Sequence, residues 1–263
     1  MDLGLKDKKA LVTGASRGLG YAVARTLTNE DCRVVINSRT GEKINRAAEK
    51  LTKETHRNVF GMAGDLSQSN VPEELVRAAV EKLGGLDILV CNAGGPPPGA
   101  FELFDETTWQ KAIDLSFMSH VRLIKSALPS LRKSSAASVL TITSYSVKQP
   151  IPNLVLSNSI RSATVGLTKS LALELGGEGI RFNSILPAWT ETERVGELMS
   201  ARAINNGTSV EEEIAKQSKE SALGRMASPQ EFANAAVFLV SPAASYVTGV
   251  MLTVDGGMYK GTL

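Results

Sequence analysis

The stretch that decides the fold reads ALVTGASRGLG and runs from Ala10 to Gly20. Residues Ala10–Thr13 are apolar or β-branched and predict a buried strand, and an amphipathic pattern beginning at Gly18 predicts a helix. Glycines occupy the turn between the two, where their missing side chains let a bound group come close to the backbone. Such a turn suits a pyrophosphate, because the free N–H groups at the start of the helix attract negative charge. A purely structural tight turn is the alternative.

The rest of the chain continues this alternation of short β-branched runs and longer helical patterns, which is typical of βαβ units building a parallel sheet. The predicted strands are Ala10–Thr13, Arg33–Asn37, Val59–Ala63, Ile88–Cys91, Ser138–Thr143, Arg181–Leu186 and Met251–Val254. The predicted helices are Gly18–Asn29, Gly41–Thr55, Pro72–Leu83, Thr107–Lys133, Val155–Leu175 and Pro229–Val240. We therefore expect one α/β domain over residues 1–263, with a doubly wound, Rossmann-like parallel sheet of seven strands and helices on both faces.

Residues 191–226 interrupt the alternation with a segment rich in charged residues, alanine, serine and asparagine. Glu212 and Lys216 are four residues apart, as are Lys216 and Glu220, and this spacing supports an amphipathic helix with modest ion pairs. We expect the segment to form a helical lid over the substrate. The alternative is a solvated surface helix with no part in binding.

Composition limits the partners that the chain can have. Its 43% hydrophobic and 21% charged residues describe an ordinary globular protein, and a net charge of +2 argues against nucleic acid or an anionic membrane, so we expect a small-molecule ligand. The N-terminus has no apolar core of a signal peptide, so we expect a cytoplasmic protein. Cys32 and Cys91 lie in apolar runs and are expected to be buried free thiols. No His, Cys, Asp and Glu residues have the spacing of metal ligands, so no metal is predicted.

The end of the second predicted strand indicates which nicotinamide cofactor fits. NAD-binding sites place an acidic residue there for the ribose hydroxyls, whereas NADP-binding sites use neutral and basic residues. Here the chain has Ser38 and Arg39 and no acid. Arg39 can bind a 2′-phosphate through its guanidinium fork, and Arg17 in the glycine turn can add a second cation. The sequence therefore favours NADP over NAD, with a solvated Arg39 as the alternative.

Taken together, these residues resemble the short-chain dehydrogenase/reductase family, and the resemblance covers essentially the whole chain. Further motifs stand in the family's order, namely Asp65–Leu66, Asn92–Gly94, Pro187–Thr192, Thr248–Gly249 and Val254–Gly257. Among family members the chain looks most similar to β-ketoacyl carrier-protein reductases, although Ala188 replaces an expected glycine. The resemblance implies a cofactor site made of Gly14, Ser16, Arg17, Gly18, Leu19, Gly20, Ser38, Arg39, Asp65, Leu66, Asn92, Ala93, Gly94, Arg161, Pro187 and Thr192.

The resemblance also implies hydride transfer between nicotinamide and a carbonyl or alcohol. In the family a serine polarises the oxygen, a tyrosine exchanges its proton, a lysine lowers the tyrosine pKa and an asparagine holds a water relay. Ser144 matches the serine, but Ser157 stands at the tyrosine position, Arg161 at the lysine position and Ser116 at the asparagine position. Ser144, Ser157, Arg161 and Ser116 are therefore the candidate catalytic residues of a non-standard site.

The substitutions weaken the expected proton transfer. An aliphatic hydroxyl such as Ser157 ionises far above a phenol, and Arg161 stays charged, although its guanidinium can still hydrogen-bond the nicotinamide ribose. Loss of general acid–base help removes about 10²–10⁴ in rate. Tyr145 and Lys148 follow Ser144 and are possible replacement donors, with loop packing as the alternative. His120 is expected to be a packing or surface residue.

The leading hypothesis is an NADP-linked oxidoreductase that resembles 3-oxoacyl reductases and has a non-standard active site. A second hypothesis is a cofactor-binding, catalytically inactive relative that acts as a sensor or as the partner subunit of an active homologue. A third is non-redox chemistry such as dehalogenation, for which Arg161 fits but the absent tyrosine and the intact glycine turn do not. We also expect a homo-oligomer, a tetramer or a dimer, formed through the helices near Thr107–Lys133 and Val155–Leu175.

Overall fold

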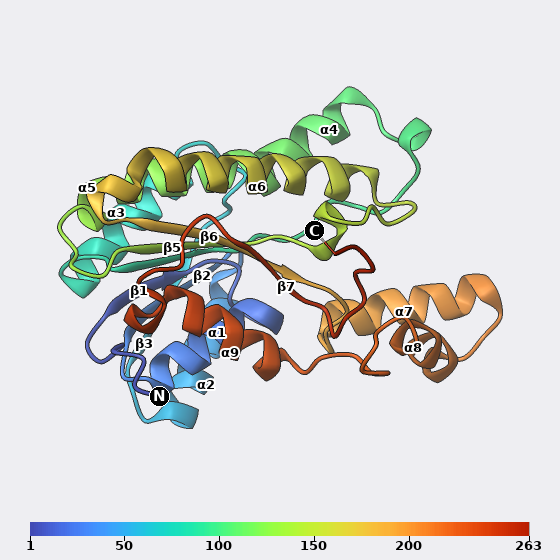
Figure 1. Cartoon of the computed structure of the whole chain (residues 1–263), viewed down its shortest axis with the longest axis horizontal. Helices are drawn as coiled ribbons and strands as arrows, with labels where there is room; N and C mark the ends of the chain where they lie inside the picture. The colour runs from blue at the N-terminus through green and yellow to red at the C-terminus, as the bar shows by residue number, and fades with distance from the viewer. Residues whose placement is uncertain (263) are drawn as a thin grey trace.

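Seven parallel strands form the centre of the molecule in the computed structural model, which describes residues 1–262 (Figure 1). The strands are β1 (Lys9–Val12), β2 (Arg33–Ser38), β3 (Val59–Ala63), β4 (Ile88–Cys91), β5 (Ser138–Ile142), β6 (Arg181–Pro187) and β7 (Met251–Val254). Their order is β3-β2-β1-β4-β5-β6-β7, and every neighbouring pair is parallel. The predicted doubly wound sheet is confirmed.

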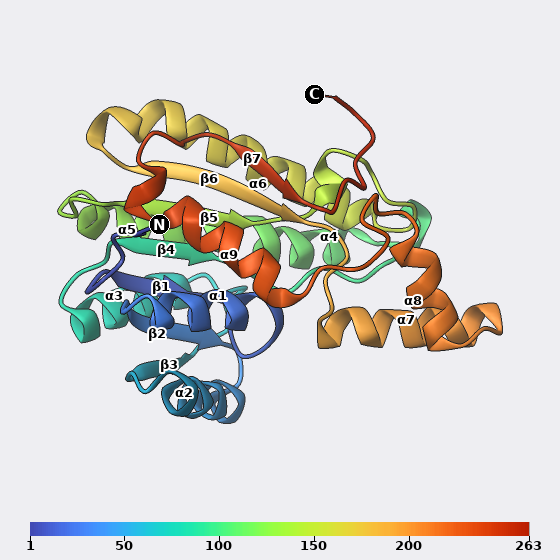
Figure 2. The same ribbon diagram turned by 60° about the horizontal axis from the view of Figure 1, so that its bottom comes forward.

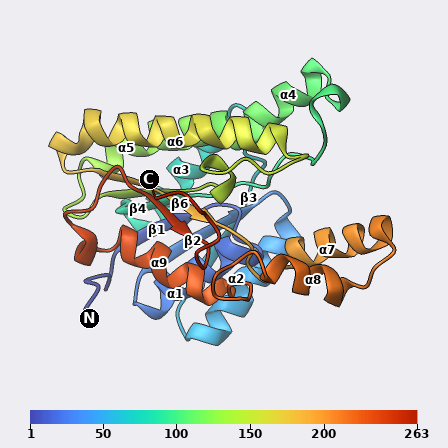
Figure 3. The same cartoon turned by 45° about the vertical axis from the view of Figure 1, so that its right-hand side comes forward.

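Helices cover both faces of this sheet (Figures 1 and 3). They are α1 (Gly18–Asn29), α2 (Gly41–Thr55), α3 (Val71–Leu83), α4 (Glu106–Ile113), α5 (Ser119–Leu131), α6 (Val155–Leu175), α7 (Glu193–Asn206), α8 (Val210–Ser218) and α9 (Pro229–Val240). Helices α1, α2 and α9 enclose one apolar cluster against the sheet, and α3, α5 and α6 enclose a second on its other face. Within residues 1–262 no helix is long and apolar enough to cross a membrane.

Both faces of the central strands are buried, which explains their continuous apolar sequence. Val12 in β1 belongs to the cluster under α1 and α9, whereas its neighbour Leu11 belongs to the cluster under α3 and α5. Phe182 and Phe232 are the largest fully buried side chains, one on each face. Cys32 and Cys91 are buried and free, as predicted. Burial in these clusters raises the pKa of both thiols, to about 12 for Cys32.

The prediction of a single helix over Thr107–Lys133 is wrong in one respect. It is divided into α4 and α5 by a π-helical turn, Asp114–Met118. A π-helical turn inserts about one extra residue, too small a change for hydrophobic periodicity to reveal over this length. The turn carries Ser116, and π-helical turns are frequent at functional sites.

The segment predicted as a helical lid, residues 191–226, holds two helices rather than one and then continues without a helix from Lys219 to Met226. Gly207 ends α7 with a φ of +65°, and Ser209 begins α8. Neither expected ion pair of Lys216 forms within 4 Å among residues 1–262. Glu212 instead closes a capping box, in which its Oε2 accepts the Ser209 N–H at 2.9 Å.

Helices α7 and α8 form a hairpin beyond the carboxyl ends of the strands (Figure 2). Arg202 of α7 donates a 2.7 Å hydrogen bond to Gln217 of α8, and its guanidinium lies 5.0 Å from the Trp189 ring. Glu213 of α8 accepts hydrogen bonds from Asn206 and Thr208 at 2.9 and 2.8 Å. The hairpin is therefore held together by its own side chains.

Candidate functional site

The site begins at the junction of the loops that follow β1 and β4, the two neighbouring strands from which the chain winds in opposite directions. In open α/β sheets, ligands bind at this point, outside the carboxyl ends of the strands. The Thr13 hydroxyl donates to the Asn92 carbonyl oxygen at 2.8 Å and accepts the Asn92 N–H at 2.9 Å. Asn92 Nδ2 donates to the Gly14 carbonyl oxygen at 3.0 Å. These bonds join the glycine turn to the loop Asn92–Gly94.

The turn needs its glycines for two separate reasons. Gly14 and Gly18 have φ values of +58° and +61°, which L side chains rarely adopt. At Gly20 the limit is space, because a Cβ there would lie 2.6 Å from the Gly14 carbonyl oxygen and 2.9 Å from Asn92 Nδ2. The turn can therefore pack against Asn92 only without side chains at these positions.

The N-terminus of α1 is left open by this packing. Arg17 is the N-cap residue, with an extended backbone, and its side chain does not cap the helix. Its guanidinium instead forms an exposed ion pair with Glu197 of α7 at 2.8 Å. The first N–H groups of a helix need partners, and an anion is a suitable one. Ser16, Arg17, Gly18, Leu19 and Gly20 thus form a cradle that fits a pyrophosphate.

The end of β2 offers cations and hydroxyls rather than an acid. Ser38 is half-buried, with its hydroxyl 3.5 Å from the Thr40 carbonyl oxygen, and Arg39 is exposed and forms no ion pair among the described residues. After the neighbouring strand β3, Leu66 is buried, and Asp65 Oδ1 accepts hydrogen bonds from the N–H and the hydroxyl of Ser67. This surface fits a 2′-phosphate better than a pair of free ribose hydroxyls.

The candidate catalytic residues gather around the end of β5. Ser144 Oγ accepts the Ser146 N–H at 3.1 Å. Arg161 Nη1 donates to the carbonyl oxygens of Ile142 at 3.2 Å and Thr143 at 3.0 Å. Ser157 is half-buried and lies one helical turn before Arg161 on α6, so the two share a face of the helix. The structure thus brings the Arg161 guanidinium to the residues immediately before Ser144.

Arg161 is a fixed positive charge at this place. Burial lowers its pKa to about 10, with a smaller contribution from the charge of Arg194. A guanidinium with that pKa remains protonated at neutral pH, so Arg161 cannot exchange protons there. Its Nε and Nη2 donate no hydrogen bond within residues 1–262, and neither atom is fully buried. Both nitrogens thus keep hydrogen-bonding capacity.

The π-helical turn positions Ser116 close to the same point. Its hydroxyl lies 3.4 Å from the Gly94 carbonyl oxygen, in the loop that follows β4. Its own carbonyl oxygen accepts hydrogen bonds from Thr164 Oγ1 at 3.1 Å and from His120 Nδ1 at 3.0 Å. Ser116, Gly94 and α6 are therefore linked directly.

His120 is a buried packing residue, which agrees with the expectation of a packing or surface position. Only 2% of its surface is exposed, and burial, together with the charge of Arg161, lowers its pKa to about 4. Nδ1 donates to the Ser116 carbonyl oxygen, and the Cys91 backbone, which also raises the pKa, lies near the ring. Nε2 has no hydrogen-bond partner among residues 1–262. Sequence reasoning did not find this relationship, because nothing in the pattern shows that the charge of Arg161 acts on His120.

The two proposed replacement donors lie in other contacts. Tyr145 is buried, and burial raises its pKa, with further contributions from Glu220 and Asp255. Those carboxylates belong to the segment after α8 and to the loop after β7. Lys148 Nζ lies 5.2 Å from the centre of the Tyr259 ring. Tyr145 is therefore a buried phenol with a raised pKa, and Lys148 lies against a C-terminal ring.

Residues Pro187–Thr192 lead from β6 to the hairpin. The Ala188 N–H donates to the Val254 carbonyl oxygen at 3.1 Å, which ties the segment to β7. Thr192 caps α7, accepting the Val195 N–H at 3.4 Å. Its Cγ2 lies 3.6 Å from the position that a Cβ of Gly18 would take. The N-termini of α1 and α7 are therefore neighbours.

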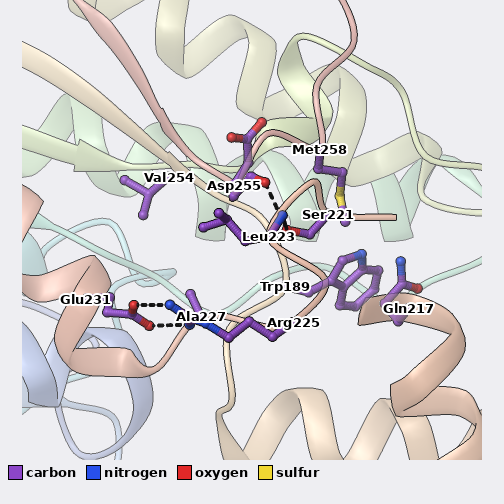
Figure 4. Close-up of a pocket in the computed structure, with 11 residues that line it drawn as sticks. Trp189, Gln217, Ser221, Leu223, Arg225, Ala227, Glu231, Val254, Asp255 and Met258 are labelled. Atoms are coloured by element: carbon purple, nitrogen blue, oxygen red, sulfur yellow. Dashed lines mark hydrogen bonds and ion pairs between the residues drawn. The ribbon is translucent and has the colours of Figure 1, made fainter. Parts of the chain in front are cut away.

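A cavity lies beside this segment, on the side of the C-terminal residues (Figure 4). Its lining includes Trp189, Gln217, Ser221, Asp255 and Met258. Neither Ser144 nor Arg161 lines it, so it is separate from the catalytic candidates. Among residues 1–262 no group of three or more His, Cys, Asp or Glu side chains is arranged to hold a metal ion.

Comparisons with known proteins agree with this geometry. The family model described as "Enoyl-(Acyl carrier protein) reductase" matches residues 14–259. The chain is 34% identical to dehydrogenase/reductase SDR family member 4 of Oryctolagus cuniculus, over 96% of this chain and 94% of that protein. It is 31% identical to the uncharacterized oxidoreductase YvrD of Bacillus subtilis, over 99% of both chains.

Solved structures are similar over nearly the full length. The L-sorbose reductase of Gluconobacter frateurii, complexed with NADPH and L-sorbose, has a TM-score of 0.95 and 30% identity, covering 99% of this chain and 100% of that chain. An actinorhodin polyketide ketoreductase with NADPH has a TM-score of 0.92 and 30% identity, covering 97% of this chain and 98% of that chain.

Proposed function

The chain belongs to the short-chain dehydrogenase/reductase family, and from this premise we propose that it is an NADP-linked oxidoreductase acting on a carbonyl or alcohol. The observation that carries the proposal is the uncapped N-terminus of α1, set over the glycine turn that Asn92 holds in place. An anion-binding helix end at this point of an open sheet suits a dinucleotide pyrophosphate. The similar structures that contain NADPH support the same cofactor.

The choice of NADP over NAD is supported by the end of β2. Arg39 is exposed and unpaired among the described residues, so its guanidinium can bind a 2′-phosphate without first losing an ion pair. Arg17 already has an exposed partner in Glu197, and exposed ion pairs contribute little. Both arginines can therefore serve the phosphates of the cofactor.

The proposed reaction uses Ser144 and Arg161. NADPH, when bound, supplies the hydride. Ser144 Oγ already accepts the Ser146 N–H, so its own O–H can donate a hydrogen bond to the substrate oxygen, while the proton that completes the alcohol comes from water. Arg161 is anchored through Nη1, which leaves Nη2 and Nε to hold the ribose and to stabilise negative charge near the substrate oxygen. Ser157 takes the place of the usual phenol without its acidity, so we expect slow turnover.

The test is a fluorescence titration with NADPH and NADH, followed by NADPH oxidation over a panel of carbonyl compounds. The panel holds a keto sugar, a 3-oxoacyl thioester and a cyclic polyketide-like ketone. We expect tighter binding of NADPH than of NADH, and oxidation by at least one carbonyl. Failure to bind either nucleotide would contradict the proposal and leave non-redox chemistry, such as dehalogenation, as the better account.

A second candidate is a cofactor-binding relative without turnover, acting as a sensor or as the partner subunit of an active homologue. It is favoured by the burial of Tyr145, which raises the pKa of its phenol, and by the position of Lys148 Nζ over the Tyr259 ring. Tight NADPH binding without oxidation by any carbonyl on the panel would select it.

We also propose a homo-oligomer formed through α6. The exposed face of α6 carries small residues, among them Ser162, Ala163 and Gly166, and the 76% exposed Leu173. Small residues let two helices approach closely, and an exposed leucine gains from being covered. Sedimentation should give a dimer or a tetramer, and Leu173→Asp should shift it toward smaller species; a monomeric wild type would contradict the proposal.

A further inference from the structure

Arg194, which follows Thr192 in the first turn of α7, lies between the hairpin and the loop after β4. Its guanidinium lies against Gly95, since a Cβ on that glycine would be 2.6 Å from Arg194 Nη2 and 3.0 Å from Nη1. Gly95 directly follows the Asn92–Gly94 loop that is bonded to the glycine turn. Arg194 therefore reaches from the hairpin to the candidate cofactor site.

Arg194 has no ion-pair partner of its own. No carboxylate lies within 4 Å of its guanidinium among the described residues, and Glu197 is engaged with Arg17. Burial lowers the pKa of Arg194, the charge of Glu197 opposes this effect, and the smaller contribution of Arg17 lowers the pKa again. Arg194 in turn lowers the pKa of Arg161. Arg194 thus lies within electrostatic reach of the glycine turn and of the reaction centre.

The helix position of Arg194 adds to this imbalance. The N-terminus of a helix carries partial positive charge, which favours acidic side chains in the first turn and disfavours basic ones. The N-terminus of α7 also lies beside that of α1, where Thr192 approaches Gly18. Glu193 Oε2, 4.0 Å from the Cβ position of Gly18, offsets part of this charge, whereas a bound anion could pair directly with the Arg194 guanidinium.

We propose that Arg194 binds the pyrophosphate of NADP(H) from the hairpin side, so that loading of the cofactor fixes α7 over the site. The inference rests on the proposed function, because it assumes that the glycine turn binds this cofactor. Arg194 lies near the start of α1 and is free of competing ion pairs, whereas Arg161 is committed to β5. A planar guanidinium also suits bidentate bonds to phosphate oxygens.

The test measures NADPH binding by fluorescence for the wild type, Arg194→Ala and Arg194→Lys. Lys216→Ala is the matched control, because it removes one positive charge from the exposed surface of α8 in the same hairpin. We expect Arg194→Ala to weaken NADPH binding about 10- to 100-fold, the range for hydrogen bonds to a charged group. Arg194→Lys should lose less NADPH affinity than Arg194→Ala, and the affinity of Lys216→Ala should stay within about twofold of the wild type. Circular dichroism checks that every variant is folded.

Ionic strength and inorganic pyrophosphate provide a second readout. The NADPH affinity of the wild type should fall more steeply with added salt than that of Arg194→Ala, because salt screens the charge pair that the variant lacks. Inorganic pyrophosphate, measured by calorimetry, should also bind more weakly to Arg194→Ala.

Each contrary outcome has a distinct meaning. Equal NADPH affinity in the wild type and Arg194→Ala would overturn the inference. If Arg194→Ala instead loses turnover only on carboxylate-bearing carbonyls, the bound anion belongs to the substrate and the pyrophosphate assignment is wrong. If the wild type binds no NADPH, the proposed function fails, and the role of Arg194 is then decided by pyrophosphate alone: equal binding by the two proteins, or none, overturns it.

Discussion

Arg161 Nη1 donates a 3.0 Å hydrogen bond to the carbonyl oxygen of Thr143, the residue immediately before Ser144. A second bond, to Ile142, fixes the same nitrogen, so the guanidinium is anchored to the end of β5 by the backbone. Backbone anchoring holds this cation at the two residues before Ser144, and within residues 1–262 no carboxylate lies within 4 Å of it. The site therefore provides orientation and charge stabilisation, while its capacity for proton transfer is small.

Restoring the usual pair should raise the rate. A phenol near a lysine can exchange protons near neutral pH, so Ser157→Tyr combined with Arg161→Lys should increase NADPH-dependent reduction by about 10²-fold or more. The matched control is Ser157→Phe with Arg161→Lys, which adds the same ring without the hydroxyl. Steady-state rates on one responsive carbonyl provide the measurement. A folded, NADPH-binding Tyr variant no faster than its Phe control would contradict the prediction.

Stability should fall between pH 6.5 and pH 4 because of His120. Its pKa is about 4 in the folded protein and about 6.5 in the unfolded chain. Below pH 6.5 the unfolded chain therefore binds a proton that the folded protein excludes, and unfolding becomes easier as the pH falls. The full difference is on the order of 3 kcal/mol. Denaturant unfolding of the wild type and of His120→Gln across this range should show a smaller pH dependence in the variant.

The other histidine of the chain provides the control for that experiment. His56 is exposed and has a φ of +56°, a conformation that asparagine tolerates well. His56→Asn should keep the pH dependence of the wild type. If His120→Gln and His56→Asn give the same dependence as the wild type, His120 is not responsible.

Arg39 should decide the preference between the two cofactors. Arg39→Ala should weaken NADPH binding about 10- to 100-fold, because a charged hydrogen bond to the 2′-phosphate is lost. Binding of NADH, which lacks this phosphate, should change little. Arg46→Ala is the matched control, since Arg46 is an exposed arginine of α2 paired with Glu42. An unchanged ratio of NADPH to NADH affinity in Arg39→Ala would contradict the assignment.

Gly20→Ala should disrupt both the turn and cofactor binding. Its Cβ would overlap backbone and amide atoms, so we expect a loss of about 1–3 kcal/mol in unfolding free energy. Gly196→Ala is the comparison, because a Cβ at that position in α7 meets nothing within 4 Å. Helix propensity predicts a gain of up to about 1 kcal/mol for Gly196→Ala. Thermal melts of equal midpoint for the two variants would contradict the packing described for the turn.

Much of the fold could be predicted because the relevant signals are local. Apolar runs such as Ile88–Cys91 and the glycine turn after β1 define their elements within a few residues. The π-helical turn Asp114–Met118 could not be predicted, because it leaves the hydrophobic pattern nearly unchanged. Gly207 gave a signal for the break between α7 and α8, since glycine commonly ends a helix with a positive φ.

The site was harder to predict than the fold. Motif positions identified Ser144, Ser157 and Arg161. The other relationships in the site depend on contacts between segments that are distant in sequence. Arg194 reaches Gly95 across about a hundred residues of sequence, and the charge of Arg161 on α6 lowers the pKa of His120 on α5. Neither pairing has a spacing that a single sequence could reveal.

The most direct test of the account is single-turnover oxidation of bound NADPH by a responsive carbonyl, compared between the wild type and Ser144→Ala. Ser144→Thr serves as the control that keeps a hydroxyl. The account predicts that Ser144→Ala binds NADPH normally and oxidises it at least about 10²-fold more slowly than the wild type, with Ser144→Thr in between. Equal single-turnover rates in the wild type and Ser144→Ala would contradict the claim that hydride transfer takes place at this serine.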